Sequence, residues 1–390
     1  MPLPSVAPFA SSFTPEVPDL LHALRCSLAL STYQAGRVVV FSPQGESLAQ
    51  LNRAFDAPMG LGVAGEGADL KLAVAERAAV HVLANAPALA AGYPRQRGTY
   101  DALLLPRRTL HTGPLDLHDL AFTPGPDGRP GGLVAVNTRF SCLCRLGGPV
   151  NGAGLDSFEP VWAPPFVSAL APEDRCHLNG LAVDAAGGPA YVTALGATDT
   201  PRGWSDGRLT GGVVLDVASG EAVAGGLAMP HSPRLARVGG EERLFVLLSA
   251  TGRLGAVDRR SGAVEEVCDL GGFARGASVR GDYLFVGVSK IRRRSTFADL
   301  PVSAEAGAAG AVIVHLPSGR VAGRIAFEAS VEEIYDVAVL PELARPGLVG
   351  PRQGVLARAI TAGAAGYWAH DAPPEAAPPE AAPPEAAPEA

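Results

Sequence analysis

Three histidines carry the strongest chemical signal in this sequence. His118, His177 and His231 each stand at or just before a short apolar run. Three neutral imidazoles suit a divalent transition metal and leave coordination positions open. An open position lets a bound water lose a proton near neutral pH, or lets O₂ bind a redox metal. If the fold brings the three together, they predict a site for Fe, Cu or Zn; the alternative is that each histidine is a polar cap bonded to a neighbouring carboxylate or to backbone.

Oxygen donors flank the same apolar runs. Glu333, Asp336, Asn179 and Asp119 can supply metal ligands, acceptors for the imidazole N–H groups, or a general base. Tyr335 can donate a proton or simply pack. We take Glu333, Asp336 and Tyr335 as catalytic candidates, and Asn179 and Asp119 as candidates for substrate binding.

Two arginines, Arg234 and Arg275, complete the predicted site. A guanidinium can hold a substrate carboxylate as a bidentate fork. An Arg–Asp pair that neutralises a channel is an equally good interpretation of either residue. A Cys/His metal site would be a further alternative, but buried free thiols are the better interpretation of the nearby cysteines, which are Cys142, Cys144 and Cys176.

A recurring element must position these residues. A polar head, a short apolar run and a turn recur six times along the chain, at residues 58–64, 117–122, 175–184, 229–236, 273–279 and 334–339. Such spacing indicates a repeat fold. Each copy is interpreted as the innermost strand of one blade of an all-β, six-bladed β-propeller. Parallel inner strands would bring their polar heads to one mouth of the central channel.

The two ends of the repeat predict how the ring closes. Strand-like segments at 28–33, 36–42 and 46–51 have no inner strand before them, and an unpartnered inner strand occurs at 334–340. We therefore expect the C-terminal inner strand to pair with the N-terminal strands, which removes free sheet edges. The predicted organisation is an irregular lead-in at 1–23, the propeller at 24–350, an extension of uncertain structure at 351–370, and a disordered tail at 371–390. The tail repeats Pro-Pro-Glu-Ala-Ala and could dock on a protein partner.

Composition excludes several classes of function. The net charge of −7 offers no basic field for nucleic acid. No apolar stretch is long enough to cross a membrane, and the N-terminus has no secretory pattern. Five cysteines without a repeating spacing do not form a disulfide framework, so a cytoplasmic protein is expected. No Walker loop, Rossmann fingerprint or Gly-x-Ser-x-Gly elbow occurs, so no nucleotide cofactor is expected.

Several segments resemble a bacterial family of conserved hypothetical proteins over roughly residues 24–350. They are residues 31–36, 137–143, 176–182, 229–234 and 333–337. The family implies no activity. More distantly, the chain is similar to gluconolactonase, regucalcin and strictosidine-synthase-like propellers, many of which hold a divalent metal with Glu, Asn and Asp. Histidines here stand where oxygens would be expected, which favours a softer metal. Carotenoid-cleaving propellers, with a ring of histidines around iron, offer a looser analogy.

The favoured hypothesis is a metal-dependent enzyme that acts on a small molecule or peptide at the channel mouth. An all-histidine site slightly favours O₂-dependent oxidation or hydroxylation, with metal-assisted hydrolysis of a lactone or ester as the runner-up. A non-catalytic propeller that binds a peptide or small ligand is the alternative from another class. The substrate, the metal, the reaction and the oligomeric state do not follow from the sequence.

Overall fold

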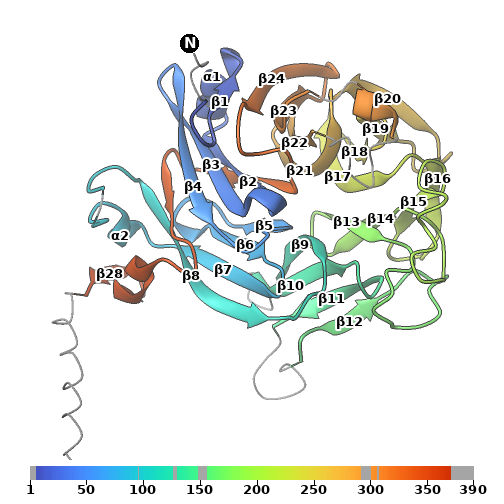
Figure 1. The fold of residues 1–390 in the computed structure, drawn as a ribbon, viewed down its shortest axis with the longest axis horizontal. Helices are drawn as coiled ribbons and strands as arrows, with labels where there is room; N and C mark the ends of the chain where they lie inside the picture. The colour runs from blue at the N-terminus through green and yellow to red at the C-terminus, as the bar shows by residue number, and fades with distance from the viewer. Residues whose placement is uncertain are drawn as a thin grey trace, which may run out of the picture.

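The computed structural model describes residues 6–94, 96–125, 130–147, 156–290, 300–304 and 307–369. Six β-sheets surround a central axis, and the chain runs round the ring from blade to blade (Figure 1). Each inner strand contacts the inner strand of the next blade, and the last contacts the first. In ring order the inner strands are β5 (Leu61–Ala64), β9 (Leu117–Pro124), β13 (Leu178–Val183), β17 (Pro230–Val238), β21 (Phe273–Arg280) and β25 (Asp336–Pro341). The predicted six-bladed propeller is confirmed.

The remaining strands of each blade pair antiparallel, in sequence order outward from the inner strand. Blade 1 adds β2 (Cys26–Ser31), β3 (Arg37–Gln44) and β4 (Ser47–Ala54); blade 2 adds β6 (Lys71–Ala75), β7 (Ala79–Asn85) and β8 (Ala102–His111). Blade 3 adds β10 (Pro130–Asn137), β11 (Cys142–Leu146) and β12 (Glu159–Trp162); blade 4 adds β14 (Pro189–Ala194), β15 (Gly212–Asp216) and β16 (Ala222–Leu227). Blade 5 adds β18 (Glu241–Leu248), β19 (Arg253–Val257) and β20 (Val264–Asp269); blade 6 adds β22 (Tyr283–Ser289), β23 (Gly310–His315) and β24 (Arg320–Phe327).

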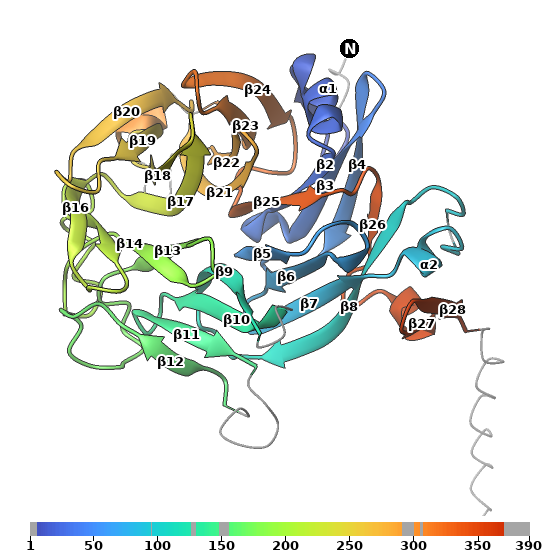
Figure 2. The ribbon, with the colours of Figure 1, turned by 180° about the vertical axis from the view of Figure 1, so that it is seen from behind.

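The ring closes as predicted, by pairing of β25 with β2 in a register from Cys26↔Pro341 to Ser31↔Asp336. The lead-in is not irregular, because it contains β1 (Ser11–Phe13) and helix α1 (Glu16–Ala23). β1 extends blade 6 by pairing with β24, so the N-terminus joins a second blade. After the last inner strand, β26 (Pro346–Leu348) lies parallel to β8 at the outer edge of blade 2. These pairings fasten both ends of the repeat (Figure 2).

The hydrophobic core lies between the blades. Side chains alternate between the two faces of a strand, so each strand serves two neighbouring layers. In β2, Leu28 and Leu30 pack with Phe285 of blade 6. Ala29, between them, packs with Leu72 of blade 2. A strand buried on both faces needs a continuous apolar run, which explains why all six residues of β2 are buried.

Glycines allow the inner strands to approach one another closely. A Cβ on Gly180 would lie 2.4 Å from Pro233 Cδ of the next blade. A Cβ on Gly276 would lie 2.4 Å from Asp336 Cα, and φ at Gly276 is +77°. Non-glycine residues rarely adopt this conformation and would also clash here. The narrow middle of the channel therefore depends on glycine at both positions.

A repeated hydroxyl contact joins successive blades, and we call it the blade clasp. A Ser or Thr at or just after the end of a second strand donates to a backbone carbonyl at the start of the next inner strand. The pairs are Ser31 to Met59, Thr138 to Leu178, Ser249 to Ala274 and Ser289 to Ile334, with oxygen–oxygen distances of 2.6, 2.6, 2.5 and 3.1 Å. The clasp fixes the starts of four inner strands, where the candidate site residues lie.

Two features lie outside the blade plan. A long connection in blade 4 joins β14 to β15 and buries Trp204 against Met229 and Phe273. The segment at 351–369, left uncertain by the sequence, forms the 3₁₀ helix η4 (Gly354–Arg358) and a hairpin of β27 (Ala359–Ala362) and β28 (Ala365–Trp368) beside helix α2 (Pro87–Ala90). The predicted tail at 371–390 lies outside the described residues. Among the described residues, no helix combines the length and the hydrophobicity that a membrane span requires.

Candidate functional site at the near mouth

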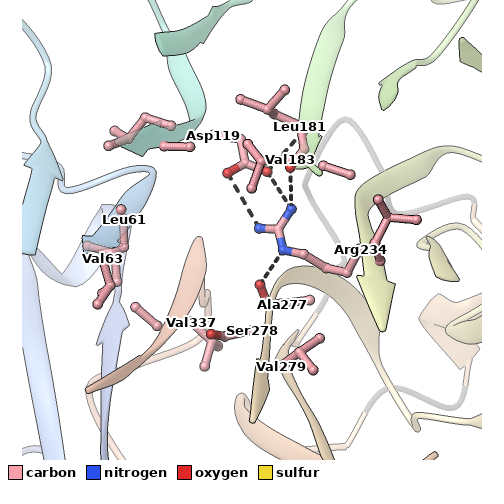
Figure 3. A pocket seen from close by; sticks show the side chains of 16 residues that line it. Leu61, Val63, Asp119, Leu181, Val183, Arg234, Ala277, Ser278, Val279 and Val337 are labelled. Atoms are coloured by element: carbon pink, nitrogen blue, oxygen red, sulfur yellow. Dashed lines mark hydrogen bonds and ion pairs between the residues drawn. The ribbon is translucent and has the colours of Figure 1, made fainter. Parts of the chain in front are cut away.

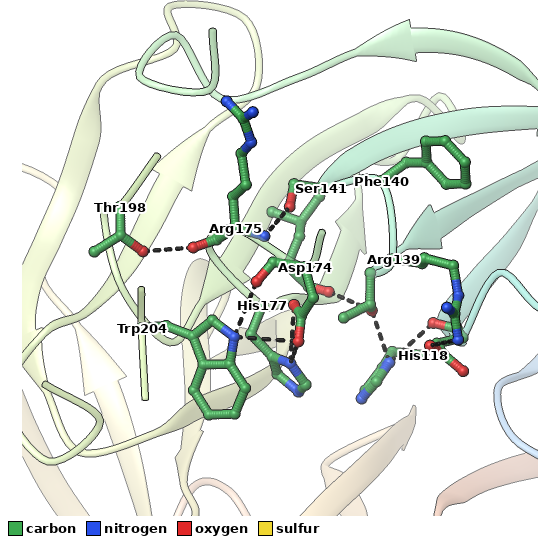
Figure 4. Close-up of polar contacts among 12 residues, drawn as sticks. His118, Arg139, Phe140, Ser141, Asp174, Arg175, His177, Thr198 and Trp204 are labelled. Atoms are coloured by element: carbon green, nitrogen blue, oxygen red, sulfur yellow. Dashed lines mark hydrogen bonds and ion pairs between the residues drawn. The ribbon is translucent and has the colours of Figure 1, made fainter. Parts of the chain in front are cut away.

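The three predicted metal ligands lie at the same end of neighbouring inner strands, which we call the near mouth. His118 is the second residue of β9, His177 directly precedes β13, and His231 is the second residue of β17. The rings of His118 and His177 are in contact, with centroids 4.9 Å apart and planes at 80° (Figure 4). His231 packs edge-on against Phe273 at 5.9 Å.

Hydrogen bonds assign the proton of His118 to Nδ1. This nitrogen lies 2.7 Å from Thr138 Oγ1 and 3.0 Å from the carbonyl oxygen of Asp116. The hydroxyl of Thr138 donates its only proton to the Leu178 carbonyl in the blade clasp. Both neighbours of Nδ1 are therefore acceptors, so Nδ1 must be the donor. The lone pair of the neutral ring remains on Nε2.

His231 repeats this arrangement two blades further on. Its Nδ1 lies 2.8 Å from Ser249 Oγ and 3.1 Å from the carbonyl oxygen of Met229. The hydroxyl of Ser249 is already donating to Ala274. The clasp thus fixes the same tautomer in His118 and His231. Neither Nε2 atom has a hydrogen-bond partner among the residues that the structure describes.

His177 is fixed by a carboxylate that sequence reasoning missed. Its Nδ1 lies 2.9 and 3.2 Å from the two carboxylate oxygens of Asp174. Asp174 also accepts the indole N–H of Trp204 at 3.1 Å, and the Trp204 ring lies 4.4 Å from the imidazole. Asp174 precedes His177 by three residues in a segment without strand pattern. The only sequence signal for it is an acidic residue close to a candidate ligand.

Burial keeps two of the imidazoles uncharged. The pKa of His118 is held well below its usual value, first by burial and then by the charges of His177 and Arg275. The pKa of His231 is lowered to about 3, first by burial and then by Arg275. A neutral imidazole is the form that binds metals and accepts protons. Both rings are therefore in this form at neutral pH.

Several residues at the near mouth have a strained backbone conformation. Asp116, Asp174, His177 and Met229 all have left-handed conformations, with φ values of 54°, 49°, 50° and 53°. Each such residue costs on the order of 1 kcal/mol, and strained residues gather at functional sites. All four either contact a candidate histidine or are one. The strain thus lies in the segments that aim the imidazoles.

Arg275, Glu333 and Tyr335 form a second group at the near mouth. Arg275 pairs with Glu333, and its Cζ lies 3.8 Å from the centre of the Tyr335 ring. The Tyr335 ring is in turn 5.2 Å from His118. Nε of Arg275 is buried without a hydrogen-bond partner in the described chain. Burial raises the pKa of Tyr335 well above its usual value, so the phenol keeps its proton.

The other predicted site residues lie deeper, in the layer that we call the waist: Asp119, Asn179, Arg234 and Asp336. Arg234 Nη1 lies 2.9 Å from Asp119 Oδ2 and also donates to the carbonyl of Leu181. The alternative interpretation of an Arg–Asp pair that neutralises the channel therefore describes Arg234. Asn179 accepts from Thr193 Oγ1 at 2.6 Å, and its Nδ2 is buried without a partner in the described chain.

The two Asp side chains of the waist play matched roles. Asp119 Oδ2 accepts the N–H of Leu181 in the next blade, and Asp336 Oδ2 accepts the N–H of Leu61 in the next blade. Burial, and then the negative charge of Asp119, raise the pKa of Asp336 to about 8, although Arg234 opposes this rise. One guanidinium thus faces two carboxyl groups, and Asp336 is the one that keeps a proton.

The cysteines near the site are buried thiols. Burial raises the pKa of Cys142 and of Cys176 to about 12, and burial raises that of Cys144 as well. All three pack inside hydrophobic clusters. Across the described ranges, no three His, Cys, Asp or Glu side chains are already arranged to hold a metal ion.

Comparisons with known proteins place the chain in a family. No curated protein matches the sequence. The solved structures with a similar fold include the nidogen/laminin complex, at 9% identity and a TM-score of 0.49, and a protein of unknown function from Bacteroides caccae, at 8% identity and a TM-score of 0.45. Each comparison covers 81% of this chain and 98% of the other. A family model matches residues 15–349, and the chain therefore belongs to the family described as a domain of unknown function, DUF4915.

Proposed function

We propose that the near mouth is the active site of a metal-dependent enzyme, in which His118, His177 and His231 bind one divalent transition metal. The observation that carries this proposal is the shared state of the three rings. Each Nδ1–H is held by an oxygen acceptor, which leaves Nε2 of each ring as the nitrogen that could coordinate a metal. Metal-bound histidines characteristically donate the other ring N–H to a carboxylate or carbonyl, which fixes the tautomer and orients the ring.

The site is not preformed for three ligands, so binding would require side-chain adjustment. His118 and His177 already touch, whereas His231 packs against Phe273. Apo sites are often looser than their loaded forms. The metal would draw the Nε2 atoms together while the Nδ1 anchors keep the ring orientation. Two neutral imidazoles need lose no proton to bind, which favours loading at neutral pH.

The identity of the metal would select the reaction. Iron or copper would support O₂-dependent oxidation or hydroxylation, and zinc would support hydrolysis of a lactone or ester. The all-histidine ligand set slightly favours the oxidation. Of the two acidic candidates, Glu333, which pairs with Arg275 at the near mouth, is better placed than Asp336 to act as a general base. Asp336 lies at the waist with its oxygens bonded to backbone N–H groups. The distant resemblance to gluconolactonase-like propellers bears on the fold alone.

A second candidate function is non-catalytic binding of a small molecule or peptide at the same mouth. The buried Nε of Arg275 that lacks a partner favours it, because an unsatisfied donor is costly unless a ligand supplies an acceptor. Trp204, packed on His177, offers an aromatic face beside it. The binding candidate predicts a ligand that is held without turnover and a metal content of zero.

The first experiment compares metal content in the wild type and in His177→Ala by plasma mass spectrometry, on protein purified without a histidine tag. We expect about one Fe, Cu or Zn per chain in the wild type and loss of most of it in the variant. His315→Ala is the matched control, because His315 lies on β23 and bonds Ser318, away from the mouth. Absence of metal after anaerobic purification and reloading would reject the metal site and leave the binding candidate.

The blade clasp gives a further prediction. Ser249→Ala and Ser289→Ala each remove one buried hydroxyl and should each lower the free energy of unfolding by roughly 1–2 kcal/mol. Only Ser249 also holds a histidine. Metal affinity should therefore fall about 10–100-fold in Ser249→Ala and stay unchanged in Ser289→Ala. Chemical denaturation and metal titration measure the two quantities, and equal affinities in both variants would contradict the anchoring role.

A further inference from the structure

A second pocket opens at the opposite end of the channel, which we call the far mouth. Its lining residues come from all six inner strands, and on β9, β13 and β17 they lie further along the strand than the three histidines. Arg234 and Asp119 form its floor, and apolar side chains that include Val63, Val183 and Val279 surround it (Figure 3). Its volume is about 230 Å³. Neither proposed function of the near mouth uses this pocket.

We infer that the far mouth binds a small monocarboxylate whose apolar body is about the size of one aromatic ring. The size follows from the volume. Sites for drug-sized ligands occupy roughly 300–1,000 Å³, and an apolar cavity of about 150 Å³ holds benzene. A pocket of 230 Å³ therefore suits one ring with one short substituent. Its valine walls would bury that ring, and the floor would meet the substituent.

Hydrogen-bond donors on the floor determine the charge of the substituent. Arg234 Nε donates to the Ala277 carbonyl, and Nη1 has three acceptors, which are Asp119, Leu181 and Pro233. Among the residues that the structure describes, Nη2 has only a long contact of 3.4 Å with Asp119 Oδ1. A guanidinium has two N–H groups on Nη2, so at least one remains available to a ligand.

A second donor lines the same pocket. The hydroxyl of Ser278 accepts the backbone N–H of Val339 at 3.2 Å and donates to no other described residue. Its proton is therefore free to point toward the pocket that Ser278 lines. A carboxylate has two charged oxygens, so it can accept one hydrogen bond on each of them. A hydroxyl group offers both donors only a single uncharged oxygen. Arg234 and Ser278 together thus favour a carboxylate.

A titration with benzoate, monitored by isothermal calorimetry or ligand-observed NMR, tests this inference. Benzyl alcohol is titrated in the same way as the neutral analogue. We expect saturable binding of benzoate and at least about tenfold weaker binding of benzyl alcohol, because the charge-assisted bonds are lost. Ser278→Ala should weaken benzoate binding several-fold and leave benzyl alcohol little changed. No saturable binding, or equal binding of the two compounds, would overturn the inference.

Variants of the wall locate the binding. Val63→Phe and Val183→Phe add bulk to the pocket and should abolish benzoate binding. Val161→Phe makes the same change on the outer strand β12, where Val161 is 41% exposed, and should leave binding unchanged. His177→Ala should also bind benzoate normally, so this result does not depend on the near-mouth proposal. Melting temperatures confirm folding, and benzoate affinity that survives in both filled variants would refute the location.

Discussion

Replacement of Arg234 with methionine is expected to lower the free energy of unfolding by about 3–5 kcal/mol. Arg234 crosses the waist from blade 5 and bonds carbonyls or carboxylates of blades 3, 4 and 6. Methionine has a similar length but leaves Asp119 as a buried charge without its cation; the Asp119 side chain is 7% exposed. An uncompensated buried carboxylate is among the most destabilising consequences of a single substitution. Urea denaturation of the two proteins measures the loss.

Two controls separate the buried charge from lost packing. Arg145→Met removes an exposed partner of Glu159, with side chains 51% and 61% exposed, and should cost less than about 1 kcal/mol. Asp119→Asn in the Arg234→Met background removes the stranded charge. We expect the double variant to be more stable than the sum of the single effects by roughly 1–3 kcal/mol. Additive effects would mean that packing, and not the ion pair, accounts for the loss.

The repeat and its closure could be predicted because they depend on strong local patterns. A buried inner strand needs an apolar run, and each run here carries a polar head and a turn. The outer strands are harder to predict, since they are solvated and need no such run. β12 and β20 are largely exposed, with Glu159 in one and Glu265 and Glu266 in the other. Their place in the sheet follows from pairing with the strand inside them, which is a tertiary effect.

The site could be predicted only in part because the sequence does not separate layers along a strand. His118 and Asp119 are adjacent, and the sequence predicts both at one mouth. Successive side chains of a strand point in opposite directions and lie about 3.3 Å apart along it. The structure accordingly places His118 at the near mouth and Asp119 at the waist. The anchors Thr138 and Ser249 were also missed, because the blade clasp depends on contact between blades.

The waist has consequences for how the two mouths are connected. Arg234 and Asp119 lie between the histidines and the far mouth, where the inner strands approach closely at Gly180 and Gly276. One cation between two carboxyl groups leaves the layer close to neutral while Asp336 keeps its proton. Loss of that proton would add a negative charge in a buried place, and pH should therefore act on the stability of the whole ring.

We accordingly expect Asp336→Asn to remove a pH-dependent destabilisation that the wild type carries. The pKa of Asp336 is about 8 in the folded protein, because of burial and the charge of Asp119, and about 3.9 in an unfolded chain. Between these values the folded protein binds one proton more than the unfolded chain. Stability contributed by this group therefore falls as pH rises from about 4 to 8, by at most roughly 1.4 kcal/mol per pH unit, and is constant above that range.

Denaturation at intervals from pH 5 to pH 9 measures this effect as the difference between wild type and variant. Asparagine cannot ionise. The free energy of unfolding of Asp336→Asn should therefore increase relative to that of the wild type up to about pH 8 and then level off. The asparagine Oδ1 can still accept one of the N–H groups of Leu61 and Val337, and loss of the other gives a constant cost of about 1 kcal/mol. Asp282→Asn, at an exposed turn between β21 and β22, is the matched control and should follow the wild type at every pH. Parallel curves for wild type and Asp336→Asn would mean that Asp336 is ionised in the folded protein, with Arg234 shared between two carboxylates.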